Sequence, residues 1–179
     1  MTAAATPPGL PLVDTPQDAE VREHFEALAS GSGILNLHRM MAHAPALMKA
    51  SGEMALTFRR NTMLPRALAE LAVLRTAQVV ESDYVWARHL PLARASGVSE
   101  QQIEEIANWH DSVAFTPAQK AALGFAEKAA RQSPIKDEDF TALKRYFSSR
   151  EIVEIAMLVG FYVSTAIFIK ALAVPDEKA

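Results

Sequence analysis

The chain has 179 residues, half of them hydrophobic, and a formal net charge of −3 at pH 7. This length suits one domain with a sizeable core, and the slight acidity argues against nucleic acid or an anionic membrane as the main partner. No cysteine is present, which excludes disulfides, thiolate nucleophiles and cysteine-ligated metals.

The first 14 residues are rich in proline and alanine and lack the basic and apolar regions of a secretory signal. We therefore expect residues 1–14 to form a flexible N-terminal tail, residues 15–179 to form the folded domain, and the protein to be cytoplasmic.

Helix signals follow one another along the first half of the chain. Thr15 and Pro16 provide an N-cap and a proline at the first helical position, and Pro45 separates two further short helices. Pro65 opens a helix that we expect to run to about residue 80. The next helix should cover residues 82–95 and end at Gly97, because a glycine there can adopt the left-handed conformation of a helix end.

The second half repeats these signals. Ser99 with Gln102 and Thr116 with Gln119 have the spacing of capping boxes, another helix starts near Asp137, and Ser148 with Glu151 caps the last one. No segment shows strand alternation or a hairpin turn. The pattern predicts an all-α fold of about eight helices in a single domain.

The last helix contains an uncharged run over residues 155–169. A membrane span needs roughly 20 apolar residues, so we expect this helix to be buried in the core or in a subunit interface. Excess apolar surface of this kind also favours a homo-oligomer, between a dimer and a hexamer.

A polar pair is expected across the hairpin formed by residues 65–80 and 82–95. Glu70 stands 11 residues before Glu81 and His89 stands 8 after it, so the two lie roughly 16 and 12 Å from the turn. Glu70 is surrounded by leucines, where a carboxylate is costly unless it is paired or protonated. We therefore expect Glu70 to bond one ring nitrogen of His89, an arrangement that can deliver a proton near neutral pH.

Other side chains could complete a substrate site beside this pair. Ser82 shares a helix face with His89, Pro91 should leave an unpaired carbonyl near it, and an anionic substrate would need an arginine. The residues proposed for substrate binding are Ser82, Tyr84, Trp86, Arg75 and Arg88. The alternative is that the Glu70–His89 pair is structural and the aromatics belong to the core. The histidines lack metal-ligand spacing, so we expect no metal and no cofactor.

The hairpin resembles the signature of the carboxymuconolactone decarboxylase family, which shares the alkylhydroperoxidase-D-like (AhpD-like) fold. The resemblance covers about residues 35–175 and includes "LPRALAELAVLRTAQVVESDYVWARHLPLARASGVSEQQIEEI", with a glutamate followed by Tyr-x-Trp-x-x-His. It implies an orthogonal helical bundle and a proton-relay pair at Glu70 and His89.

The departures from the family limit what its chemistry implies here. In the peroxidase branch a Cys-x-x-Cys motif precedes the histidine, but this chain has Ser82 and Val85 at those positions. A serine hydroxyl cannot reduce a peroxide through a sulfenic acid. The lactone decarboxylases carry a histidine and a glutamate where this chain has Tyr84 and Val85, so their substrate does not transfer directly.

Three functions follow as hypotheses. The first is a cysteine-independent acid/base enzyme of the carboxy-lyase type, acting on a small carboxylated or lactone-like molecule. The second is a non-catalytic family member that binds a small ligand or acts as a scaffold. The third is an alkylhydroperoxidase-type antioxidant activity, which the absence of cysteine disfavours.

Overall fold

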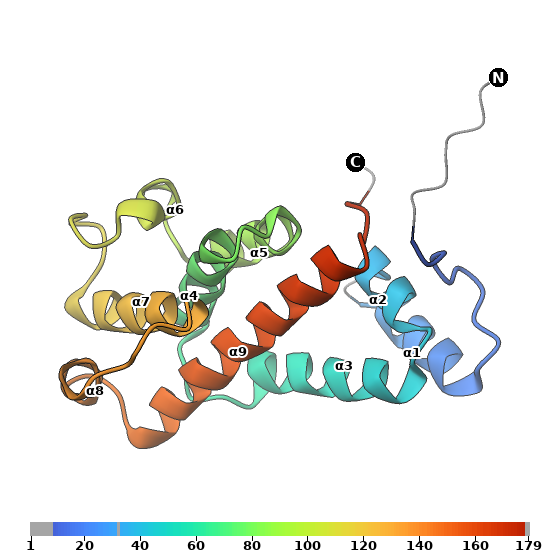
Figure 1. The fold of residues 1–179 in the computed structure, drawn as a ribbon, viewed down its shortest axis with the longest axis horizontal. Coiled ribbons are helices and arrows are strands. Elements are labelled where there is room, and N and C mark those ends of the chain that lie inside the picture. The colour runs from blue at the N-terminus through green and yellow to red at the C-terminus, as the bar shows by residue number, and fades with distance from the viewer. Residues whose placement is uncertain (1–8, 32, 178–179) are drawn as a thin grey trace. The chain divides into compact units, whose positions relative to one another are not determined.

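The structure is a computed structural model that describes residues 9–31 and 33–177. In these residues it contains nine α-helices, one short 3-10 helix and no strand, which confirms the all-α prediction. The elements are α1 (Ala19–Ala29), α2 (Asn36–Met41), α3 (Pro45–Arg60), α4 (Arg66–Val79), α5 (Asp83–Ala95), α6 (Glu100–Glu105), η1 (Ile106–Asn108), α7 (Pro117–Ala130), α8 (Asp137–Lys144) and α9 (Ser149–Ala171) (Figure 1).

The chain divides into two compact units, one from residues 1–57 with 168–179 and the other from residues 58–167. In the first unit, Val21, Phe25 and Met48 form a small apolar cluster. The described part of the predicted tail contacts α2, because the Val13 amide donates to the Arg39 carbonyl at 3.2 Å and His43 Nε2 bonds the Pro11 carbonyl at 2.7 Å. Residues 1–8 of that tail lie outside the described residues.

Helix α4 is the centre of the second unit, and α5 and α7 pack against it (Figure 1). Every residue from Leu68 to Ala77 is buried. A helix that is apolar on nearly every side is expected in this position, because only a surrounded helix can bury all its faces. Leu71, Leu74, Ile106 and Leu123 are completely buried in the resulting core.

The N-cap predicted at Thr15 was wrong, because α1 begins at Ala19 and the Asp18 side chain accepts from the Val21 amide. Three other predicted helix starts are confirmed. Ser82, Ser99 and Thr116 each accept a hydrogen bond from the backbone amide three residues later. Gly97 has a φ of 89° after α5, a conformation that side chains disfavour. Glu81 takes up a φ of 53° between α4 and α5, so the tight turn that brings Glu70 toward His89 lies where it was expected.

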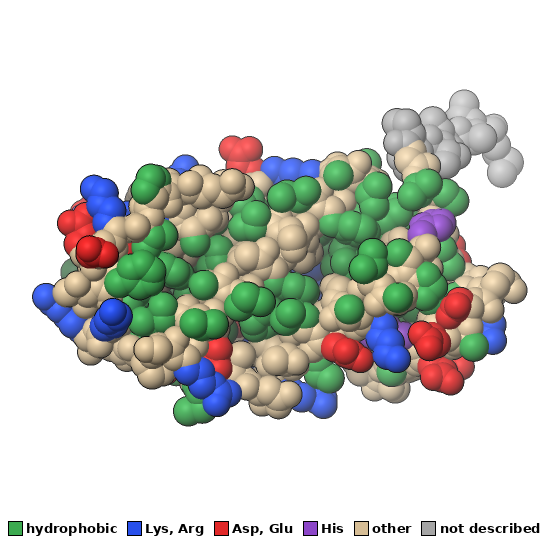
Figure 2. Space-filling model, turned by 60° about the horizontal axis from the view of Figure 1, so that its bottom comes forward, with side chains coloured by type: hydrophobic (Ala, Val, Ile, Leu, Met, Phe, Trp, Pro, Cys, Tyr) green, Lys and Arg blue, Asp and Glu red, His purple; other side chains and the backbone are tan. Residues whose placement is uncertain are grey.

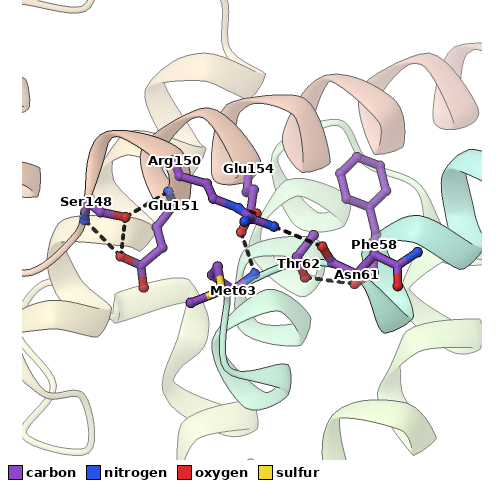
Figure 3. A network of polar contacts seen from close by, with 8 residues as sticks. All are labelled: Phe58, Asn61, Thr62, Met63, Ser148, Arg150, Glu151 and Glu154. Carbon is purple, nitrogen blue, oxygen red and sulfur yellow. Dashed lines mark hydrogen bonds and ion pairs between the residues drawn. The ribbon is translucent and has the colours of Figure 1, made fainter.

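The start of α9 is held against the loop between α3 and α4 by a polar network (Figure 3). Arg150 pairs with Glu154 at 2.8 Å and also donates to the Asn61 carbonyl at 3.3 Å, while Glu154 accepts from the Met63 amide at 2.8 Å. These bonds fix where α9 begins relative to α4, and therefore which α9 side chains reach the polar pair.

Helix α9 is longer than the uncharged run in its sequence, and it is not buried on every side. Ile155 and Leu158 are buried, but Val153 and Ile167 are each 60% exposed and Met157 is 50% exposed. Within the described residues α9 alone is long and apolar enough to span a membrane by length and composition. Figure 2 shows many hydrophobic side chains at the surface on one side of the molecule.

Candidate active site

Glu70 and His89 meet across the α4–α5 hairpin. Glu70 Oε2 lies 2.8 Å from His89 Nδ1, and the two residues are only 1% and 9% exposed. Their predicted hydrogen bond is therefore confirmed. The near-equal distance of the two positions from the turn at Glu81 brought them together, because residues equally far from the turn of an antiparallel hairpin lie side by side.

Arg66 completes the pairing of the buried carboxylate. Its guanidinium bonds Glu70 Oε1, the oxygen that His89 does not use. Arg66 begins α4, four residues before Glu70, a spacing that brings side chains together on one helix face. Both carboxylate oxygens thus have a cationic or hydrogen-bonding partner, which offsets the cost of burying the charge. Sequence analysis missed Arg66, although this spacing could have revealed it.

The second ring nitrogen of His89 is open. Nδ1 donates to Glu70, and Nε2 has no hydrogen-bond partner within residues 9–31 and 33–177. Nε2 is therefore not used by a protein group among the described residues, and a small molecule that bonded it could exchange a proton with it.

Tyr162 of α9 lies against the histidine. The ring centroids of His89 and Tyr162 are 4.6 Å apart, and the rings are nearly perpendicular at 83°. Burial raises the pKa of the Tyr162 phenol well above its ordinary range and the charge of Glu70 adds to this effect, against smaller opposing effects of Arg66 and Arg59. The phenol therefore stays protonated at neutral pH. Tyr162 was not predicted from the sequence, because it lies 73 residues beyond His89 within the uncharged run of α9.

Two phenylalanines extend this aromatic surface. Phe161 contacts Tyr162 with a centroid distance of 5.2 Å, and Phe58 at the end of α3 contacts Phe161 at 5.6 Å. Aromatic pairs at these distances and tilts are favourable and hold each ring in place. The orientation of Tyr162 beside His89 is therefore fixed by packing.

Three of the proposed substrate-binding residues lie together elsewhere. Arg75, Ser82 and Trp86 line a cleft of about 460 Å³ beside the α4–α5 turn, with Gln78, Glu81 and Asp83 among its other residues. His89 is not among the residues that line this cleft. The Glu70–His89 pair and these three residues are thus on different parts of α4 and α5.

Arg75 is already engaged in an ion pair. Its Nε and Nη2 atoms bond the same oxygen of Glu127 at 3.1 and 2.7 Å. Trp109 Nε1 donates to this oxygen at 3.0 Å as well. Arg75 is 8% exposed, so a substrate carboxylate would have to compete with Glu127 for a largely buried guanidinium.

The remaining proposed residues differ in their surroundings. Tyr84 is buried in α5, whereas Arg88 is partly buried and has no ion-pair partner in the part of the chain that the structure describes. The substrate-binding roles of Ser82, Tyr84, Trp86, Arg75 and Arg88 stay predictions.

Comparison with known proteins agrees with this architecture. The model of the carboxymuconolactone decarboxylase family matches residues 45–128, which include both helices of the hairpin. The uncharacterized protein YnjA of Escherichia coli K12 is 26% identical over 121 residues, which are 66% of this chain and 66% of that protein. The chain therefore spans just under two thirds of the length of that relative.

Solved structures show the same fold. An uncharacterized peroxidase-related protein from Silicibacter sp. TM1040 superposes with a TM-score of 0.82 at 21% identity, over 97% of this chain and 96% of that one. The debrominase Bmp8 in its apo form superposes with a TM-score of 0.81 at 18% identity, over 93% and 90% of the two chains. At these identities the likeness shows the AhpD-like fold alone.

Proposed function

We propose that this chain, which matches the carboxymuconolactone decarboxylase family model over residues 45–128 and contains no cysteine, is a cysteine-independent acid/base enzyme of the carboxy-lyase type. Its substrate is a small carboxylated or lactone-like molecule with a carbonyl conjugated to the bond that breaks. One observation supports this proposal: a buried Glu70, paired on both oxygens, bonds Nδ1 of His89, whose Nε2 has no hydrogen-bond partner among the described residues.

The reaction needs only proton transfer from this chain. The carbon–carbon bond to the carboxylate breaks, carbon dioxide leaves, and the electron pair moves into the conjugated carbonyl to give an enolate. His89 in its imidazolium form donates the Nε2 proton to the enolate carbon, while its Nδ1 proton stays in the bond to Glu70. Solvent then returns a proton to Nε2. A positioned proton donor of this kind contributes roughly 10²- to 10⁴-fold to the rate.

A carboxylated substrate also needs a cation to hold it. Arg75 is occupied by Glu127, whereas Arg88 and Arg59 have no ion-pair partner among the described residues. Arg59 is exposed at the end of α3 and acts electrostatically on Tyr162. It is therefore the cation we favour for the substrate carboxylate, with Arg88 as the alternative.

The two other hypotheses are weaker. A non-catalytic family member that binds a small ligand needs the same opening at His89 but no proton transfer, so a His89 variant distinguishes it from an enzyme. Thiol-dependent peroxide reduction has no nucleophile in this chain, because Ser82 and Val85 stand at the cysteine positions. We do not propose debrominase activity, since the likeness to Bmp8 is one of fold.

A decarboxylation screen tests the proposal. The purified chain is incubated with a panel of lactone carboxylates and β-keto acids, and carbon dioxide release is measured for the wild type, for His89→Gln and for His110→Gln. His110 is a matched control, since it also bonds a carboxylate, Asp111 at 3.0 Å, but at the surface. We expect release by the wild type and by His110→Gln, and at least a hundredfold loss in His89→Gln. Release that survives in His89→Gln would contradict the proposal.

A further inference from the structure

We propose that the Tyr162 hydroxyl donates a hydrogen bond to an oxyanion of the bound ligand, so that Tyr162 and His89 form one site for a planar, conjugated oxyanion. The inference rests on the proposed function, because it names the second group that an enolate would meet. Nothing in the hairpin signature points to α9, which lies far along the chain from Glu70 and His89.

The first observation is the position of the phenol. Its ring packs edge-on against the imidazole of His89, with the ring centroids 4.6 Å apart, so a ligand that bonds one of the two side chains lies next to the other. Phe161, the residue before Tyr162, packs on its ring at 5.2 Å and on Phe58 at 5.6 Å. Rings held on two sides cannot turn away without losing these contacts, so the hydroxyl keeps one direction.

The second observation is that the hydroxyl has no partner. Among residues 9–31 and 33–177 no hydrogen bond to the Tyr162 hydroxyl is formed. The hydroxyl is therefore not used by a protein group in that part of the chain, and neither is His89 Nε2. A hydroxyl that can donate and a ring nitrogen that can carry a proton, on two rings in direct contact, are the groups that a ligand oxygen and a reacting carbon require.

The charges around the pair define the ligand class. Glu70 bonds both His89 and Arg66, so its carboxylate is already satisfied, and Arg59 adds a cation with no ion-pair partner among the described residues. The phenol remains protonated because burial and Glu70 raise its pKa, so it offers a hydrogen and no competing charge. A neutral donor beside a cation fits an enolate or phenolate oxygen better than it fits an ammonium group.

Binding of 4-nitrophenolate tests the inference without a known substrate. The probe absorbs differently as phenol and as phenolate, so a titration at constant pH reports both its affinity and its ionisation when bound. We expect the wild type to bind it as the phenolate and Tyr162→Phe to bind it at least tenfold more weakly, because a hydrogen bond to a charged oxygen is lost. Tyr146→Phe is the matched control, since Tyr146 is 46% exposed at the end of α8, and it should bind like the wild type.

Two results would overturn the inference: a wild type that does not bind the phenolate, or a Tyr162→Phe variant that binds it as tightly as the wild type. Retention of the helical circular dichroism spectrum by Tyr162→Phe shows that the change is local. The outcome is separate from that of the decarboxylation screen. A tenfold loss of phenolate affinity in Tyr162→Phe supports the oxyanion site, whatever the decarboxylation screen shows. If no compound of the panel releases carbon dioxide, that result counts against the lyase proposal alone.

Discussion

Glu70 Oε2 accepts a hydrogen bond from His89 Nδ1 over 2.8 Å, and both residues are buried. The chain also contains a histidine–carboxylate pair at its surface, His110 with Asp111 at 3.0 Å, where both side chains are at least 80% exposed. The two pairs have similar lengths but different surroundings. Solvent competes for the bond at the surface pair, whereas burial protects the bond between Glu70 and His89. Only the buried pair therefore fixes which ring nitrogen is left for a ligand.

Replacing Glu70 should separate hydrogen bonding from charge. Gln keeps an oxygen that can accept from His89 Nδ1, so Glu70→Gln should lower the free energy of unfolding by about 1 kcal/mol. Leu removes the acceptor and leaves a buried donor without a partner, so Glu70→Leu should cost about 3 kcal/mol. Urea denaturation of the two variants measures the difference. An equal loss in both would show that the bond to His89 does not contribute to stability.

The absence of cysteine predicts the outcome of a peroxidase assay. Pure, metal-free protein should not turn over an organic hydroperoxide in the presence of a dithiol, because no residue can form the sulfenic acid. Substituting cysteine for both Ser82 and Val85 restores the motif and serves as the comparison. Turnover by the wild type above the buffer rate would show that another group in this chain reduces peroxides.

Glu127 should make stability depend on pH in the acid range. Burial opposes its ionisation, but hydrogen bonds from Trp109 and Arg75 outweigh this effect and lower the pKa of the carboxyl. A carboxyl whose pKa is lower in the folded protein than in the unfolded chain stabilises the fold at pH values above its ordinary pKa of about 4.3. This stabilisation is lost as the pH falls from about 4.3 toward the pKa in the folded protein. Thermal denaturation between about pH 6 and 3 should show a shallower decline in Glu127→Gln than in the wild type.

Self-association through α9 is the expected quaternary arrangement. The exposed Val153 and Ile167 lie seven residues on either side of Gly160, and a side chain added at Gly160 would meet no atom within 4 Å. An antiparallel pair of α9 helices that cross at Gly160 would place each Val153 against Ile167 of a second copy. Such a two-fold arrangement buries the exposed apolar face and lets the helices approach closely.

A single introduced cysteine tests this arrangement, because the chain contains no other. Oxidation of Gly160→Cys should give a disulfide-linked dimer. Val113→Cys should not, although Val113 is 92% exposed, because it lies away from α9. Sedimentation of the wild-type protein as a 19.5 kDa monomer at micromolar concentration would contradict the prediction. Binding of the wild-type protein to lipid vesicles without self-association, seen as cosedimentation, would also contradict it.

The sequence predicted the parts of the fold that depend on local signals. Ser82, Ser99 and Thr116 mark helix starts through one side chain and one nearby amide, and Gly97 marks an end through its own backbone. The Glu70–His89 contact was predictable for a related reason, since a short turn between two helices fixes which positions face each other. These inferences use residues less than 20 positions apart.

The parts that could not be predicted depend on distant contacts. Tyr162 reaches His89 from α9, whose start is bonded to the loop after α3 through Arg150 and Glu154, and nothing near Tyr162 in sequence indicates that contact. The separation of Arg75 from His89 has a similar cause. The pairing of Arg75 with Glu127, which lies 52 residues later on α7, holds its side chain at the cleft beside Ser82.

The central claim is that His89, held by Glu70, delivers the proton that replaces carbon dioxide, and product analysis in deuterium oxide tests it most directly. A substrate from the decarboxylation screen is converted by the wild type, Glu70→Gln and His89→Gln, and the product is examined by mass spectrometry and NMR. The account predicts one deuterium at the carbon that lost carbon dioxide and a rate reduced roughly 10²- to 10⁴-fold in both variants. Wild-type rates in both variants, or a product without deuterium at that carbon, would contradict it.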